Sequence, residues 1–202
     1  LSIKKIAVWC GTGNNAGDGY YTAAYLAQKG YQVQIFAAPT GDSSDLQQAI
    51  LYAQLHKIQI EPNFAVPDQF DCHIDALFGI GLNRELDQSW QNTIQHFNQL
   101  SGLKVAIDVP SGLHANTGQT LPVAIKADIT FTALAIKVGL VTGQAKEYVG
   151  QLDIISLIPN DDELKPMAYL TSSHIHLPKR QAFGHKGSYG HVLVVGGHAN
   201  MG

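Results

Sequence analysis

The chain has 202 residues, of which 45% are hydrophobic and 14% are charged, and its formal net charge is −3. This composition is typical of an ordered globular protein and excludes a disordered chain. The Lys and Arg residues are scattered, which argues against a nucleic-acid-binding surface, and no apolar run approaches the roughly 20 residues that span a membrane.

Segments typical of β-strands alternate with segments typical of helices along most of the chain. The sequence predicts strands at residues 3–9, 32–38, 72–77, 103–108, 128–132 and 151–156, and helices at residues 18–29, 43–56 and 87–100. This alternation predicts an α/β fold of three layers, αβα and Rossmann-like, with a mainly parallel sheet between the helices. Ligands of such sheets bind outside the carboxyl ends of the strands.

Two further features concern the interior of the predicted fold. Cys10 and Cys72 fall at or within expected strands, where a small buried thiol is the ordinary explanation, and two reduced cysteines fit a cytoplasmic protein. The second helix has a suitable N-cap in Ser43. It is expected to bury one apolar face, formed by Leu46, Ile50, Leu51, Leu55 and Ile58.

A glycine-rich segment, residues 10–19, joins the first expected strand to the first expected helix. A strand, a tight glycine turn and a helix start present backbone N–H groups to a ligand, and glycine permits positive φ and close approach. A dinucleotide fingerprint is matched only loosely, by Gly11, Gly13 and Ala16, and the second strand lacks the expected terminal acid. A P-loop would need a lysine that is also absent.

Two interpretations of this segment remain. In one, the segment offers amide and carboxylate oxygens to a ligand in addition to N–H donors. In the other, Asn14 and Asn15 take left-handed turn positions and Asp18 merely caps the helix.

Two more polar loops are expected at the same edge of the sheet. Residues 75–85 follow the third long strand, and residues 108–113 follow the next one. Asp75 and Asp108 could each be an ordinary strand-end acid that caps a turn. Three oxygen-rich and glycine-rich loops at one edge of one sheet instead indicate a binding site.

After residue 159 the composition changes. Residues 160–180 are polar and are interpreted as a linker, and residues 181–202 contain a new expected strand, 191–195, followed by a glycine loop. The chain is therefore expected to be a piece of a longer polypeptide. Several histidines lie in this part, but their spacings match no metal motif.

Four motifs in order resemble the NAD(P)HX epimerases, the YjeF N-terminal domain family, in the prokaryotic form that is fused to an ADP-dependent NAD(P)HX dehydratase. The motifs are residues 10–19, Asp75-x-x-Phe-Gly-x-Gly-Leu-x-Arg84, residues 106–113, and Thr130-Phe-Thr followed by Lys137-x-Gly-Leu. Ala16 replaces a glycine that is usual in the family. The resemblance implies an epimerase domain at residues 1–159 that lacks its N-terminal helices, and the opening of a ribokinase-like dehydratase domain at residues 181–202.

The resemblance implies epimerisation of the R and S forms of NADHX and NADPHX, the hydrated forms of NADH and NADPH. Dehydration with ADP or ATP would belong to the missing part of the second domain. The implied substrate-binding residues are Asn14, Asn15, Ala16, Gly17, Asp18, Gly79, Ile80, Gly81, Leu82, Asn83, Arg84, Glu85 and Asp108. Asp108 is the candidate general acid–base catalyst, because inversion beside the ring nitrogen needs proton transfer.

The resemblance also implies a potassium ion bound by Asn15, Asp75 and Ser111. Amide, carboxylate and hydroxyl oxygens suit a hard cation, and a single formal negative charge suits a monovalent ion better than a divalent one. The expected partners are the nucleotide substrate and, if the protein is a homo-oligomer, further copies of the chain; neither nucleic acid nor a membrane is indicated. The alternatives are a non-catalytic scaffold module of the same fold and an NAD-linked dehydrogenase, which the missing acid after the second strand opposes.

Overall fold

The computed structural model describes residues 3–39, 41, 43–157 and 166–170. Contacts divide the chain into two units, Leu1–Asn160 and Asp161–Gly202, and the first unit contains every helix and strand discussed below. The expected strand at 191–195, the residues 181–202 and most of the expected linker lie outside the described residues.

The first unit is built on a seven-stranded sheet in the order β3-β2-β1-β4-β5-β6-β7, and every neighbouring pair is parallel. The strands are β1 (Lys5–Cys10), β2 (Gln32–Ala37), β3 (Gln59–Glu61), β4 (Cys72–Ala76), β5 (Leu103–Ile107), β6 (Ile129–Ala133) and β7 (Gln151–Ile155). The predicted α/β fold with a mainly parallel sheet is confirmed.

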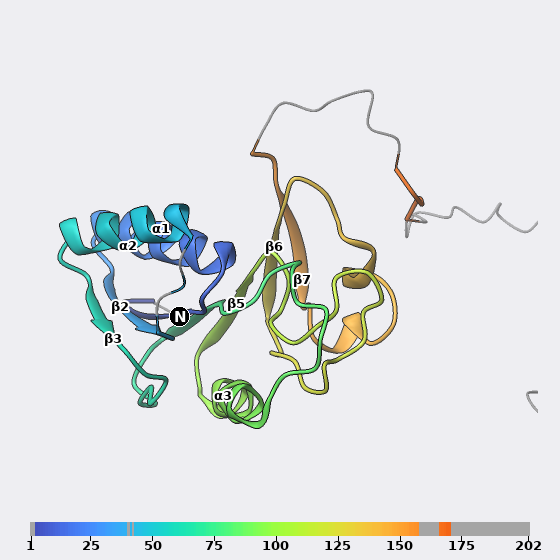
Figure 1. Ribbon diagram of the computed structural model, residues 1–202, viewed down its shortest axis with the longest axis horizontal. Helices are drawn as coiled ribbons and strands as arrows, with labels where there is room; N and C mark the ends of the chain where they lie inside the picture. Colours follow the sequence, from blue (N-terminus) through green and yellow to red (C-terminus); the bar gives the residue numbers. More distant parts are fainter. Residues whose placement is uncertain (1–2, 40, 42, 158–165, 171–202) are drawn as a thin grey trace, which may run out of the picture. The chain divides into compact units, whose positions relative to one another are not determined.

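Helices cover both faces of the sheet (Figure 1). The helices are α1 (Asn14–Gln28), α2 (Ser44–Leu55) and α3 (Gln88–Gln99), with two 3-10 turns, η1 (Val138–Leu140) and η2 (Ala145–Glu147). Side chains of β1 alternate between two cores: Val8 and Cys10 pack with α1 and α2, whereas Ala7 and Trp9 pack with α3. This alternation follows from the two-residue period of a strand and explains why β1 is apolar throughout.

The structure corrects three local expectations. Helix α1 begins at Asn14 with Gly13 as its N-cap, so Asn14, Asn15 and Asp18 lie within the helix rather than in a turn before it. In α2, Leu51 and Leu55 are 58% and 78% exposed, because the buried stripe is completed by small side chains. The buried residues of α2 are Leu46, Ala49, Ile50 and Ala53. The three-residue strand β3 was missed, since it is too short to show a pattern.

Gly11 and Gly19, the first and last glycines after β1, allow close approach of the backbone and do not have positive φ. A Cβ on Gly11 would lie 1.9 Å from the carbonyl oxygen of Leu77, and one on Gly19 would lie 2.6 Å from the Cβ of Ala76. Neither glycine is among those with positive φ. The helix start is therefore drawn against the ends of β1 and β4, which places Asn15 at the carboxyl edge of the sheet.

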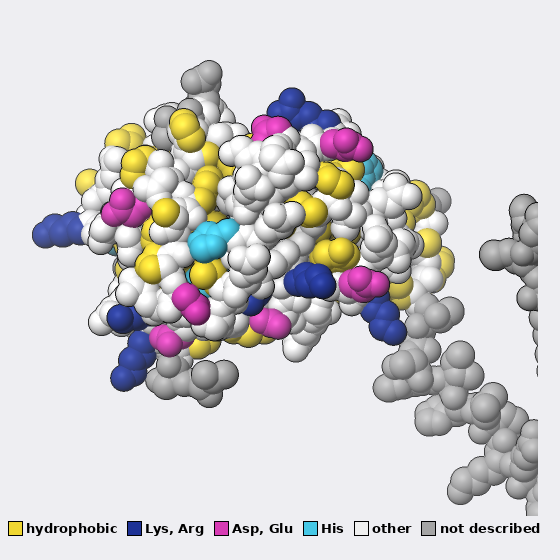
Figure 2. Space-filling model, turned by 90° about the horizontal axis from the view of Figure 1, so that it is seen from below, with side chains coloured by type: hydrophobic (Ala, Val, Ile, Leu, Met, Phe, Trp, Pro, Cys, Tyr) yellow, Lys and Arg dark blue, Asp and Glu magenta, His cyan; other side chains and the backbone are white. Residues whose placement is uncertain are grey.

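Both cysteines are buried and free, as expected from their place in strands. No helix in the described ranges is long and apolar enough to cross a membrane. On the face shown in Figure 2, acidic and basic side chains are interspersed and neither sign forms a continuous patch.

Candidate active site

The loops after β1, β4 and β5 meet at the carboxyl edge of the sheet. The chain passes from β1 to β2 on one side, while β4 pairs with β1 on the other side, so the strand order reverses between β1 and β4. Such a switch point is where open parallel sheets bind nucleotides. The polar residues predicted from the sequence are brought together here.

Asp75 and Ser111 form the buried part of the site. Asp75 is fully buried at the end of β4, and its Oδ2 accepts a hydrogen bond from the Ser111 backbone N–H at 2.8 Å. Its Oδ1 accepts from the Ser111 hydroxyl at 2.6 Å and from the Leu77 N–H at 3.1 Å. Burial raises the pKa of Asp75 to about 6, although these three hydrogen bonds oppose the rise.

Asn15 joins this cluster through main-chain carbonyl groups. Its Nδ2 donates to the Phe78 oxygen at 3.0 Å and to the Ile107 oxygen at 3.3 Å. The Ser111 hydroxyl lies 3.2 Å from the same Phe78 oxygen, and the Phe78 N–H donates to that hydroxyl at 2.8 Å. Asn15, Asp75 and Ser111 therefore tie together the start of α1 and the loops after β4 and β5.

Asp108 follows β5 in a strained conformation. Its φ is 67°, and the Val109 N–H donates to the Ile107 oxygen at 2.9 Å, which is the pattern of a γ-turn. Positive φ is uncommon for a residue other than glycine, and such strain is frequent at functional sites. The strain turns the carboxylate of Asp108 away from the direction that a continued strand would give it.

Lys137 holds one oxygen of this carboxylate. Its Nζ lies 2.5 Å from Asp108 Oδ1 and also donates to Thr132 Oγ1 at 3.0 Å and to the Ala133 oxygen at 2.7 Å. The Thr132 hydroxyl and the Ala133 N–H each approach the same Oδ1 at 3.3 Å. Oδ1 is thus the anchored oxygen.

The other oxygen faces the first glycine of the loop after β4. A Cβ on Gly79 would lie 3.5 Å from Asp108 Oδ2 and 3.3 Å from the Cβ of Asn15. Glycine at this position therefore lets the loop after β4 lie close to both Asn15 and Asp108. Asp18, one helical turn after Asn15, has its pKa raised first by partial desolvation and then by the negative charge of Asp108.

The remaining predicted residues differ in their surroundings. Ala16 is buried in the core shared with α2, and a Cβ on Gly17 would meet Ala49 at 3.9 Å. Both positions thus face α2, and only their backbone belongs to the α1 start. Leu82 is buried against α3, whereas most of the loop is exposed: Ile80, Gly81, Asn83, Arg84 and Glu85. Asn14 is exposed and accepts a long hydrogen bond from Ser43.

Three contributors were missed as site residues. Phe78 acts through its backbone, which side-chain patterns do not reveal. Thr132 lies on a buried strand, where threonine is ordinary. Lys137 stands in the fourth motif, and its place after a strand at the same edge was the signal that could have linked it to Asp108.

Residues 1–139 match the family described as YjeF-related protein N-terminus. The chain belongs to this family. The family resemblance drawn from the four motifs is therefore confirmed.

Two similar relatives are the following proteins. The chain is 35% identical to the bifunctional NAD(P)H-hydrate repair enzyme Nnr of Coxiella burnetii, over 98% of this chain and 43% of that protein. It is also 35% identical to the enzyme of the same name from Escherichia coli, over 94% of this chain and 38% of that protein. The chain thus spans about two fifths of the length of the curated relatives it matches.

A solved structure has the same fold. The crystal structure of yeast ynu0, YNL200c, matches with a TM-score of 0.68 at 18% sequence identity, covering 84% of this chain and 75% of the yeast chain. At this identity the match supports the fold alone.

Proposed function

We propose that this domain interconverts the R and S epimers of NADHX and NADPHX. The family and the relatives named as NAD(P)H-hydrate repair enzymes support the substrate class. The observation that carries the proposal is Asp108, anchored through one oxygen by Lys137 and facing Asn15 across Gly79 with the other. A fixed carboxylate at the edge of the sheet where nucleotides bind is suited to proton transfer.

The proposed reaction needs a proton at the hydroxyl oxygen of the hydrated ring. A proton passes from the Asp108 carboxyl to this hydroxyl, the C–O bond breaks, and its electron pair leaves on water. The lone pair of the ring nitrogen stabilises the resulting cation. Water then adds to the opposite face of the same carbon and returns a proton to Asp108, so that the two epimers exchange without net change.

Two neighbours of Asp108 bear on this cycle. Lys137 stabilises the carboxylate after the proton has left, while Oδ2 remains directed toward the space beside Gly79. Asp18, whose pKa is raised by partial desolvation and then by the negative charge of Asp108, is a second carboxyl group near this edge. Two acids whose environments differ are a common arrangement for acid–base chemistry. Reversible ring opening, the alternative route, would instead remove a proton from the hydroxyl and add one to the ring nitrogen as the C–N bond breaks, which also needs an acid–base group.

We further propose that one potassium ion per subunit binds beside Asn15, Asp75 and Ser111. The carbonyl oxygens of Phe78 and Ile107, the hydroxyl of Ser111 and the amide of Asn15 already converge within hydrogen-bonding distance. These are hard oxygen donors. Rotation of the Asn15 amide would present its oxygen in place of Nδ2. A bound ion would tie the three loops together and shape the pocket next to Asp108.

The relatives' name and length suggest a second activity in the full-length protein. We propose that a dehydratase domain, which would use ADP to consume one epimer, follows this domain in the full-length chain. Residues 181–202 would form its opening. Epimerisation would then supply the dehydratase with the whole pool of damaged nucleotide.

The direct test is chromatographic. Purified R or S epimer of NADHX is incubated with the protein in potassium buffer, and the approach to the equilibrium mixture is followed by chiral chromatography against a protein-free control. Glu147→Gln, at an exposed position of η2, is a matched variant that should exchange the epimers as fast as the unaltered chain. Exchange no faster than in the protein-free control would overturn the proposal and favour a non-catalytic binding module.

The ion has its own test. Potassium should raise the melting temperature saturably, since a ligand that binds only the folded state stabilises it. Tetramethylammonium at the same ionic strength should not. An identical melting temperature in both salts would exclude the potassium site while leaving the epimerase proposal in place.

A further inference from the structure

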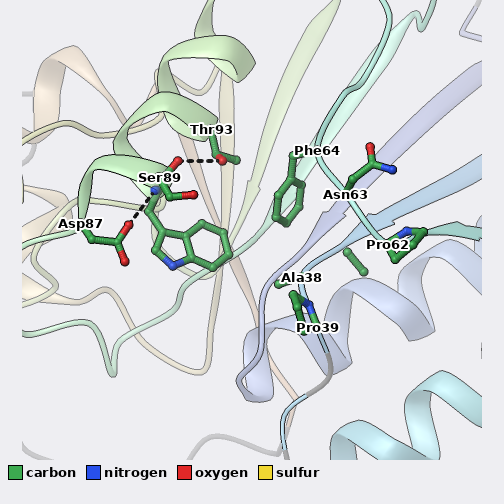
Figure 3. Close-up of a pocket in the computed structure, with 10 residues that line it drawn as sticks. Ala38, Pro39, Pro62, Asn63, Phe64, Asp87, Ser89 and Thr93 are labelled. Atoms are coloured by element: carbon green, nitrogen blue, oxygen red, sulfur yellow. Dashed lines mark hydrogen bonds between the residues drawn. The ribbon is translucent and has the colours of Figure 1, made fainter.

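A second pocket lies at the same edge of the sheet as the candidate active site. It has a volume of about 260 Å³ and is formed on one side by the residues after β2 and β3 and on the other by the start of α3. Figure 3 shows Asp87, Ser89 and Thr93 on α3 facing Phe64, Asn63 and Pro62, with Ala38 and Pro39 completing the wall. Whole small ligands usually occupy about 300–1,000 Å³, so this volume suits one part of a ligand.

The walls of this pocket are aromatic and rigidly supported. The rings of Phe64 and Trp90 lie 5.5 Å apart between centroids, and both line the pocket. Phe64 also stacks against the buried Trp9, with the ring centroids 5.7 Å apart and an angle of 5° between the ring planes. Such backing holds the Phe64 ring in place and favours a flat ring system as the occupant.

The polar groups of the pocket indicate a base or sugar and not a phosphate. The lining residues include no Lys or Arg, and the one charged residue, Asp87, would repel a phosphate. One Asp87 oxygen caps α3 by accepting from the Trp90 N–H at 3.0 Å, which leaves the second oxygen for a ligand donor. Asn63 and Ser89 add groups that both donate and accept hydrogen bonds.

Phe78 connects this pocket to the candidate active site. Its ring packs on Trp90 at 4.7 Å between centroids, while its carbonyl oxygen accepts from Asn15. Along the sheet, β2 and β5 are three strand positions apart, which is about 14 Å at roughly 4.8 Å per strand. A dinucleotide lying across the carboxyl edge has its two rings separated in this way.

We propose that the Phe64–Trp90 pocket binds the adenine base of the dinucleotide whose hydrated ring lies at Asp108; this inference rests on the proposed function. The hydrated nicotinamide ring has lost its aromatic plane and gains less from stacking, whereas adenine is flat and can stack on an aromatic wall. The pocket then sets affinity for the intact dinucleotide, while chemistry stays at Asp108.

The first experiment uses a fragment that does not react. Trp90 is one of two tryptophans, and the other, Trp9, is fully buried. AMP should quench the fluorescence of Trp90 saturably, nicotinamide mononucleotide should not, and Trp90→Leu should abolish AMP binding measured by calorimetry. Trp90→Phe, which keeps an aromatic wall, should still bind AMP in a competition assay against the epimerase reaction.

The second experiment compares two substrates. Trp90→Leu should raise the KM for NADHX by about 5- to 140-fold, corresponding to the loss of about 1–3 kcal/mol of base stacking, with kcat retained. The KM for the hydrate of reduced nicotinamide mononucleotide, which lacks the adenine, should not change. Tyr25→Leu, at an aromatic residue that is 58% exposed on α1, is the control and should leave both KM values unchanged.

The outcomes separate the two proposals. An unchanged KM for NADHX in Trp90→Leu, or an equal rise for both substrates, would overturn the adenine pocket even if epimerisation is fast. Calorimetric binding of AMP that Trp90→Leu abolishes, in a chain that exchanges no epimers, would support the pocket and overturn the epimerase. Should Trp90→Leu fail to fold by circular dichroism, Trp90→Phe carries the comparison, and loss of AMP binding in that conservative variant would count against a stacking site.

Discussion

Two buried polar side chains of β4, His73 and Asp75, have opposite surroundings although only one residue separates them. Both are fully buried, and both face the side of the sheet that α3 covers, since their partners on β1 are Ala7 and Trp9. Asp75, at the carboxyl end, accepts three hydrogen bonds from Leu77 and Ser111. His73 accepts one long bond from Trp9 at 3.4 Å, and its Nε2 has no partner within the described part of the chain.

The difference teaches that burial of a polar group does not by itself mark a functional site. Aromatic rings of Trp9, Phe70 and Phe97 surround His73 at 5.9–6.2 Å between centroids, and burial together with the charge of Lys104 lowers its pKa to about 4. Asp75 instead belongs to a network that positions two loops. The carboxyl end of the strand supplies donors and an opening, and the strand interior supplies neither.

The largest expected effect is the loss of catalytic rate when Asp108 is replaced, which replacement of His73 should not cause. Asp108→Asn should reduce kcat for epimer exchange by about 10²–10⁴-fold, the usual loss when a general acid–base group is removed, and should keep much of the substrate affinity. His73→Gln, in the strand interior, should leave kcat unchanged. Single-turnover exchange with saturating NADHX measures both. An Asp108→Asn variant that binds NADHX weakly but exchanges its epimers at the normal rate when saturated would show that Asp108 only holds the substrate.

The next effect concerns acid stability. In the folded chain His73 has a pKa of about 4, below its usual 6.5, so between these values the unfolded state binds more protons. The unfolding free energy should therefore fall as the pH drops from 6.5 to 4, by up to about 3 kcal/mol from this residue. His73→Gln keeps an acceptor for Trp9 and should remove this contribution. Urea unfolding at pH 7, 5.5 and 4.5 compares the two proteins; parallel curves would contradict the assignment.

Much of the fold follows from local patterns in the sequence. The apolar runs that became β1, β2, β4 and β5 are long enough to show a period, and their alternation with helices determines a parallel sheet. The exact ends of the helices and strands were harder to predict from the sequence. The start of α1 at Asn14 is determined by the approach of Gly11 and Gly19 to β4, and such a tertiary contact leaves no periodic signal.

The acidic residues of the candidate site could be predicted from the sequence, but the groups that bind them could not. Asp75 and Asp108 follow strands at one edge, which a topology argument can find. The ion pair of Asp108 with Lys137 joins residues that are far apart in the chain, and the positive φ of Asp108 is a property of the folded backbone. The pocket at Trp90 depends on how α3 packs beside the end of β3, which no short motif encodes.

The contribution of Asp75 to the unfolding free energy should change with pH in the opposite direction to that of His73, over nearly the same pH range. Its pKa is about 6 in the folded chain against a usual 3.8, so between these values the folded state binds more protons. Its contribution is complete below pH 3.8 and is lost as the pH rises through 6, a change of about 3 kcal/mol. Asp75→Asn should remove this slope in potassium-free buffer.

Potassium sharpens this test. A cation beside Asp75 stabilises the carboxylate, so that potassium should flatten the same slope in the unaltered chain. Urea unfolding from pH 4 to 7 in potassium and in tetramethylammonium salts measures it. The same slope in both salts would argue against an ion next to this carboxylate.

The smallest expected effect concerns Asp87, whose carboxylate accepts one hydrogen bond where that of Asp75 accepts three. Asp87 is exposed, and its Oδ1 accepts only the Trp90 N–H, at the first turn of α3. Because this bond satisfies one of the free N–H groups of the helix start, Asp87→Ala should reduce the unfolding free energy by about 1 kcal/mol. Asp87→Asn keeps an oxygen that can accept the same bond and should lose only a few tenths of a kcal/mol, the part due to the charge at the helix start. Urea unfolding at pH 7 without nucleotide measures both variants. Equal losses in the two would show that the charge, and not the capping hydrogen bond, stabilises the start of α3, and the number of donors would then no longer explain why Asp75 and Asp87 differ.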